Sequence, residues 1–167
     1  FKDRPSTTHQ TETRKYVHQH HKWHRSVHVW IVDLNSKLIV VQKRSPSKDT
    51  FPNRWDISAA GHIEYNKEEQ IQQLRNDDDD DDTKNLRISK NTAVREVAEE
   101  LGIEITTQEL QFAFTCPAEQ APWGGCNAYE DVYFVIRDST KLQFAIGLAE
   151  VTSVKWMKIS LLEKMLQ

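Results

Sequence analysis

REVAEELGI, residues 95–103, is the stretch of this 167-residue chain that decides the fold we predict. It closes a helix that we expect to begin at Asn91 or Thr92 and to end at Leu101. Apolar residues recur in this helix at i, i+3, i+4 and i+7, the spacing of one helical stripe. They are Val94, Val97, Ala98 and Leu101. Gly102 follows, where a residue with left-handed backbone angles commonly ends a helix.

Three carboxylates share the other face of this helix, at i, i+3 and i+4: Glu96, Glu99 and Glu100. Like charges at this spacing destabilise a helix by roughly 0.2–0.5 kcal/mol per pair, so a bound cation would relieve them. Clustered carboxylates suit Mg²⁺ or Mn²⁺, which also bind substrate phosphates. Arg95 can orient the group through a bidentate contact. Taken alone, however, three glutamates on a helix more often form a solvated face.

Outward from this helix, the chain alternates between strand-like segments and turns. β-branched and aromatic residues mark the strands, and residues 33–36 supply the turn of a hairpin. The expected strands span residues 23–32, 38–41, 55–63, 110–115, 131–137 and 151–157, and a second helix begins at Ser160. Strands, a helix, further strands and a terminal helix predict a mixed α/β (α+β) sandwich.

Polar segments define the expected domain boundaries. Residues 1–22 are polar and rich in histidine, which predicts an N-terminal arm ahead of a domain at 23–167. Six consecutive aspartates at 77–82 repel one another, so we expect an acidic disordered insertion at about residues 66–88. Without these charges the net charge of −3 becomes +3, since −3 + 6 = +3. That mildly basic remainder suits a polyanionic ligand but is too small for a typical nucleic-acid binder.

Together with Gly61, residues 95–103 resemble the Nudix signature G-x5-E-x7-R-E-U-x-E-E-x-G-U, in which U is apolar. The second half of the signature matches at every specified position. In the first half the central Glu would fall at Lys67, beside Glu68, and about twenty extra residues separate that position from Arg95. The resemblance implies a Nudix-type α/β/α sandwich with a mixed β-sheet.

The same resemblance implies Mg²⁺- or Mn²⁺-dependent hydrolysis of a diphosphate linkage of the nucleoside diphosphate-X type, by water attack at phosphorus. The implied metal ligands are Glu96, Glu99, Glu100 and the backbone carbonyl of Ala60. Arg95 joins them in the catalytic group. Glu130, Asp131 and Glu150 are candidates for a further acid, and Glu150 fits best because it stands just ahead of a strand.

Three residues outside the signature are candidates for substrate binding. Lys43 and Arg44 follow a strand and are plausible phosphate contacts, although a solvated loop is equally plausible. Trp123 lies in a loop and is the aromatic side chain that we expect to be exposed. It either stacks on a base or caps its loop. Trp55, by contrast, is expected to pack beneath the Gly61 loop.

Segments flanking the signature resemble the isopentenyl-diphosphate-isomerase-like branch of the family: residues 23–30, 42–45 and 55–63. Such isomerases hold a metal partly through histidines, and His24 and His62 match two of those positions. Their catalytic Cys would stand at Ala60, however, so proton transfer would lack one of its two acid/base partners. We therefore favour a hydrolase, with an isopentenyl-diphosphate isomerase and a non-catalytic nucleotide-binding domain as alternatives.

The clustered histidines His18, His20, His21 and His24 are candidates for a metal site, but for the first three we favour membership of the polar arm. Cys116 and Cys126 lack the spacing of a zinc knuckle and a nearby pair of histidines, so we expect free thiols in a reducing compartment.

No apolar run approaches membrane-spanning length, and no secretory signal is visible. We therefore expect a cytoplasmic protein that binds a small-molecule diphosphate, and neither a nucleic-acid duplex nor a membrane. Because the chain begins at Phe1 rather than Met, we expect a fragment that a targeting segment could precede. The sequence leaves the oligomeric state open.

Overall fold

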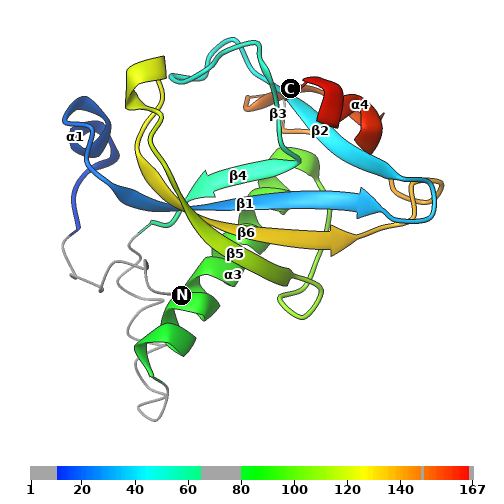
Figure 1. Ribbon diagram of the computed structural model, residues 1–167, viewed down its shortest axis with the longest axis horizontal. Helices are drawn as coiled ribbons and strands as arrows, with labels where there is room; N and C mark the ends of the chain where they lie inside the picture. Colours follow the sequence, from blue (N-terminus) through cyan, green and yellow to red (C-terminus); the bar gives the residue numbers. More distant parts are fainter. Residues whose placement is uncertain (1–10, 65–79, 148, 166–167) are drawn as a thin grey trace.

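The computed structural model describes residues 11–64, 80–147 and 149–165 (Figure 1). In chain order its elements are α1 (Arg14–Gln19), β1 (His24–Asp33), β2 (Leu38–Arg44), β3 (Trp55–Asp56), β4 (Ala59–His62), α3 (Asp81–Leu101), β5 (Gln111–Ala118), the 3-10 helix η1 (Ala121–Trp123), β6 (Ala128–Ile136), β7 (Val151–Lys158) and α4 (Ile159–Met165). All the predicted strands are present, and their bounds differ from the prediction by a few residues at most, except that residues 55–63 form two short strands.

The described strands form one mixed sheet. Its main path is β3-β2-β1-β6-β5, with β4 beside β1 and β7 beside β2. β1 and β6 run parallel along nearly their whole length, and the other described pairs are antiparallel. In Figure 1, α3 crosses behind β1, β4 and β6, whereas α4 lies beside β2.

β1 and β2 part soon after their hairpin turn. They pair only next to that turn; further along, β4 pairs with β1, while β3 and β7 pair with β2. The fully buried Ser58 bridges the gap, because its hydroxyl donates to the Val40 carbonyl (2.7 Å) and accepts from the Ile31 N–H (2.8 Å). The parting of the strands brings β4 and β2 to either side of a gap that faces α3.

Two hydrophobic cores lie on the two faces of the sheet. The larger core packs the sheet against α3 and includes Val27, Val29, Ile31, Val40, Val97 and Leu101. Burial of each such side chain contributes about 1.5–3 kcal/mol. The smaller core packs the sheet against α4 and consists of Val32, Ile39, Val41 and Met157, with Trp30, Phe134, Ile159 and Leu162 around them. Helices on both faces of a mixed sheet confirm the predicted α/β/α sandwich.

Helix α3 begins about ten residues earlier than predicted. Asp80 caps it, and its carboxylate accepts from the Thr83 N–H at 2.7 Å. The predicted disorder is therefore wrong for residues 81–88, and residues 66–79 of that prediction lie outside the described residues. The last aspartates of the acidic run lie at a helix N-terminus, where negative charge is stabilising. Gly102 ends the helix with a φ of 65°, as predicted.

The buried face of α3 also differs from the predicted stripe. Ala98 is exposed, whereas Ala93, Val97 and Leu101 are fully buried together with two of the acids, Glu96 and Glu100. The prediction that α3 has an apolar inner face and an acidic outer face is therefore wrong. The reason is that the carboxylates find polar partners inside, as described below.

Asp131 has a structural role, which corrects its candidacy as a catalytic acid. This buried carboxylate accepts hydrogen bonds from Arg25 (2.7 Å), Ser89 (2.7 Å) and Thr115 (2.6 Å). Burial alone would raise the pKa of Asp131, but Arg25 and the two hydroxyl donors outweigh it and hold the pKa below its ordinary value. Because Ser89 belongs to α3, the network fastens the first half of that helix to the sheet.

Within the predicted arm, residues 14–19 form helix α1, which has no buried residue and whose cap Thr13 accepts from the Tyr16 N–H. The prediction for Trp55 is wrong. Trp55 does not lie beneath the Gly61 loop; it is 39% exposed, with Lys155 Nζ 4.0 Å from its ring centroid. Within the described ranges, no helix has both the length and the apolar character that a membrane span requires.

Candidate active site

Glu100 lies in the gap between β2 and β4. Its side chain is 1% exposed, and one carboxylate oxygen accepts from the Gln42 side chain at 2.8 Å and from the Ala60 N–H at 3.1 Å. Burial raises the pKa of Glu100, and the hydrogen bonds from Ala60 and Gln42 oppose that shift without cancelling it. Glu100, a predicted metal ligand, thus lies where β2 has separated from β1, between β2 and β4.

Glu96 lies one helical turn earlier, directly against Gly61. A Cβ at Gly61 would lie 2.0 Å from the Glu96 carboxyl, so a side chain there would force the Glu96 side chain to move. Burial, opposed by Arg95 and reinforced by Glu100 and Glu99, raises the pKa of Glu96 to about 7.

Replacing Gly61 with alanine is expected to displace the Glu96 carboxyl, because the added methyl group would occupy its place. A misplacement of about 1 Å in a catalytic group can lower the rate about 100-fold. Turnover of the Gly61→Ala variant should therefore fall by about that factor, while circular dichroism shows an intact fold. Unchanged turnover would contradict the role given to Glu96.

Glu99 lies at the protein surface, with a side chain that is 54% exposed. Arg95 joins it to Glu96, since its guanidinium donates to Glu96 at 2.6 Å and to Glu99 at 2.8 Å. The predicted orienting role of Arg95 therefore has a geometric basis. A cation drawn to these two carboxylates competes with Arg95 for the same oxygens.

Lys48 is the site residue that the sequence analysis missed. It comes from the loop after β2, and its Nζ lies 2.5 Å from Glu150 and 3.8 Å from Glu100. Lys48 thereby links Glu150, the predicted further acid, to the buried carboxylate. A lysine in a polar loop gave no signal, because the path of that loop depends on contacts distant in sequence.

Lys43 and Arg44, the predicted phosphate contacts, do not lie with Lys48 beside the acids. Arg44 is held by its own loop: its guanidinium donates to Asp56 and to the backbone and hydroxyl of Thr50. Lys43 follows Gln42, whose side chain reaches Glu100, so strand alternation directs Lys43 to the other face of the sheet. Of these three basic residues, Lys48 is the one whose Nζ lies near Glu100 and Glu150.

Glu130 also lies away from the acids of α3, Glu96, Glu99 and Glu100. Its carboxylate lies 3.2 Å from His28 Nδ1 and accepts from Gln120 at 3.2 Å. Burial raises the pKa of Glu130 to about 7 and lowers that of His28 to about 4. Trp123 is 78% exposed, as predicted, and lies in η1.

The donor set fits a divalent cation. Glu96 and Glu100 are buried carboxylates, and burial raises the pKa of each. The Ala60 N–H points at Glu100, and in an antiparallel ladder the carbonyl of the same residue points to the same side. The predicted carbonyl ligand therefore faces the gap, and oxygen donors of this kind suit Mg²⁺ or Mn²⁺.

Comparisons by sequence identify relatives, although no family model matches the chain. Nudix hydrolase 3 of Arabidopsis thaliana is 32% identical over 152 residues, which are 88% of this chain and 17% of that protein. An uncharacterised Nudix hydrolase of Clostridium acetobutylicum is 36% identical over 101 residues, 59% of this chain and 39% of that protein. The chain thus spans less than half the length of these two curated relatives.

Solved structures share the fold at lower sequence identity. The MutT protein of Methanosarcina mazei superposes with a TM-score of 0.57 and 18% identity, over 86% of this chain and 80% of that one. The NUDIX domain of Shewanella oneidensis NrtR, cocrystallised with ADP ribose, gives a TM-score of 0.53 and 14% identity, over 85% and 75%. Such similarity extends across most of the chain.

Proposed function

We propose that this chain, which has the Nudix fold and relatives curated as Nudix hydrolases, hydrolyses a diphosphate linkage with the help of Mg²⁺ or Mn²⁺. The observation that carries the proposal is the burial of Glu96 and Glu100 between α3 and the strands that part beside it. Two buried carboxylates of raised pKa beside a backbone carbonyl suit the binding of a cation.

The proposed metal ligands are Glu96, Glu99, Glu100 and the carbonyl of Ala60. When bound, a divalent cation supplies positive charge against the diphosphate oxygens and acidity for an attacking water. Gln42 and the Ala60 N–H hold one oxygen of Glu100, and its other oxygen lies 3.8 Å from Lys48 Nζ. Arg95 orients Glu96 and Glu99 from the protein surface.

Water attack at phosphorus also needs a proton acceptor, for which Glu150 is the candidate outside the ligand set. Its carboxylate is 47% exposed and is held by Lys48, whose Nζ also approaches Glu100. Glu150 can therefore accept a proton near the buried carboxylates without itself binding a cation. Lys48 is placed to meet negative charge that develops on the phosphate.

Trp123 supports a nucleoside diphosphate-X compound as the substrate class. A tryptophan that is 78% exposed offers its face to a planar base. ADP ribose, bound by the NrtR domain, has such a base. We include Trp123 as a proposed base-binding residue on its exposure alone, because it lies in η1 beside the loop of Cys126 and not among the residues that contact Glu96 or Glu100.

A panel of substrates tests this proposal. Nucleoside triphosphates, ADP ribose, nucleotide sugars, dinucleotide polyphosphates and isopentenyl diphosphate are each incubated with the protein and excess Mg²⁺ or Mn²⁺. Cleavage of at least one nucleotide, lost when the metal is chelated, is the expected result. Isomerisation of isopentenyl diphosphate, or binding of a nucleotide with no turnover, would contradict the proposal.

Replacing Lys48 with glutamine removes the cation that links Glu150 to Glu100. A hydrogen bond to a charged group contributes about 1.5–3 kcal/mol, so kcat/KM should fall about tenfold or more. Steady-state kinetics on the best substrate measures this loss. Lys141→Gln, at a lysine that is 81% exposed, is the matched control and should keep the parental rate. Equal rates for the two variants would rule out a catalytic contribution from Lys48.

A further inference from the structure

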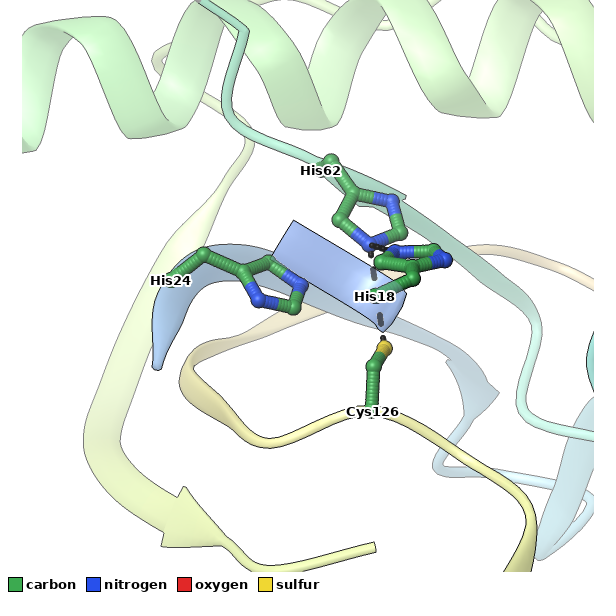
Figure 2. A group of neighbouring side chains, drawn as sticks. All are labelled: His18, His24, His62 and Cys126. Carbon is green, nitrogen blue, oxygen red and sulfur yellow. Dashed lines mark hydrogen bonds between the residues drawn. The ribbon is translucent and has the colours of Figure 1, made fainter. Parts of the chain in front are cut away.

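Three histidines and one cysteine from four separate segments converge near the start of β1 (Figure 2). One possible ligand atom from each of His18, His24, His62 and Cys126 lies within 4.8 Å of all the others. The Nε2 atoms of His18 and His62 are 3.0 Å apart, and Cys126 Sγ lies 3.8 Å from His62 Nε2. The His24 and His62 rings stack with centroids 4.6 Å apart.

We propose that His18, His24, His62 and Cys126 bind a Zn²⁺ ion, at a site separate from the carboxylates of α3. Imidazole nitrogens and a thiolate are the donors that zinc prefers, and four protein ligands make a closed tetrahedral site of the structural kind. Cys126 makes it a thiolate site.

The spacing of the donors fits a tetrahedral ion. Ligands at about 2.0–2.3 Å from a zinc ion lie about 3.3–3.8 Å from one another. The separations of 3.0 Å and 3.8 Å at His62 bracket that range, and the 4.8 Å limit leaves only a small contraction.

His24 supplies independent support. Its Nε2 is buried and has no hydrogen-bond partner, which is unfavourable for a polar atom. Its Nδ1 lies 3.1 Å from the Lys22 carbonyl, so Nδ1 carries the hydrogen and Nε2 has the free lone pair. Metal-binding histidines commonly donate their second nitrogen to a carbonyl in this way. A metal ion would satisfy the orphaned nitrogen.

The sheet separates this site from the carboxylate site. Gly61 faces Glu96 on α3, so the adjacent His62 points to the opposite face of β4. Figure 2 shows His62 extending away from the green helix α3 toward His18 and Cys126. Thiolate and imidazole donors on one face and carboxylates on the other would select different metals.

A zinc ion at this site would fasten α1 to the sheet. None of the residues of α1 is fully buried, and a helix of six residues is marginal by itself. His18 belongs to α1, while His62 belongs to β4 and Cys126 to the loop that follows η1. The ion would thereby fix the position of the N-terminal segment and of the loop that carries Trp123.

Arg14 is the group that must move. Its guanidinium donates to His62 Nδ1 at 3.1 Å, whereas a His62 that binds zinc through Nε2 carries a hydrogen on Nδ1. Arg14→Gln offers an acceptor to that hydrogen and removes a nearby positive charge. Zinc affinity of this variant should therefore rise by about tenfold, the scale of effect of such outer partners.

Cobalt titration tests the site directly. The protein is treated with a chelator, transferred to excess Mg²⁺ to occupy the carboxylates, and titrated with Co²⁺ and then Zn²⁺. We expect one Co²⁺ per chain with a thiolate-to-cobalt charge-transfer absorption, which Zn²⁺ displaces. Zinc should also raise the melting temperature and protect residues 14–19 from proteolysis.

Matched variants locate the site. Cys126→Ser should abolish the charge-transfer band and His18→Gln should weaken binding more than about 100-fold, beyond the effect of an outer partner. Cys116→Ser and His20→Gln, which change residues outside the group, should leave both unchanged. No charge-transfer band in the parent protein, or a band that survives in Cys126→Ser, would overturn the proposal. These readouts are independent of hydrolysis, so they stand even if the proposed activity fails.

Discussion

Replacing Glu100 with glutamine is expected to lower kcat for diphosphate hydrolysis about 100- to 1,000-fold at saturating Mg²⁺. The substitution keeps the shape of the side chain but replaces one carboxylate oxygen with an amide and removes the charge. Charge stabilisation by a metal contributes several kcal/mol, and each 1.36 kcal/mol is a factor of ten in rate. Steady-state kinetics on the best substrate of the panel measures the effect.

Glu104→Gln is the matched control for this variant. Glu104 is exposed and lies beyond the end of α3, so its substitution removes the same charge outside the site. It should keep the parental kcat. If Glu100→Gln kept full rate with a normal melting temperature, Glu100 would not be part of the catalytic group.

Replacing Asp131 with asparagine is expected to cost about 3 kcal/mol of unfolding free energy. Removing one partner of a buried ion pair costs about 3–5 kcal/mol, and the partial exposure of Arg25 places this pair at the lower end. The amide also has one acceptor oxygen in place of two, for the three donors Arg25, Ser89 and Thr115. Urea unfolding at neutral pH measures the difference.

The pH dependence of that difference follows from the pKa of Asp131. Its pKa is depressed in the folded protein relative to about 3.9 in an unfolded chain. The carboxylate therefore contributes its full stability above about pH 4 and loses it as the pH falls through the folded pKa. The difference in unfolding free energy between the parent and Asp131→Asn should be constant from pH 7 to 5 and shrink below pH 4. Glu163→Gln, at an exposed position in α4, should have the same unfolding free energy as the parent.

The fold could be predicted because the strand and helix patterns are local. Alternation in residues 23–32 and the stripe around Val97 each depend on neighbours along the chain. The start of α3 could not be predicted in this way. A run of aspartates resembles disorder when it is considered alone, yet Asp80 caps a helix that the Asp131 network holds against the sheet.

The site was predicted in part. The glutamates of α3 were identified through the signature, but the burial of Glu100 depends on Gln42 and Ala60, which lie 58 and 40 residues away. Lys48 was missed for the same reason, since only the folded loop brings it to Glu150. Cys126 and His62 are 64 residues apart, so no local spacing could indicate that they meet.

Hydrolysis in isotopically labelled water tests the central claim most directly, because it reports which atom the water attacks. The parent protein is incubated with Mg²⁺, its best nucleotide substrate and water enriched in heavy oxygen, and the products are analysed by mass spectrometry. The account predicts one labelled oxygen on a phosphate group of the products and none on a carbon atom. Label on carbon, or no cleavage of any substrate in the panel, would contradict it.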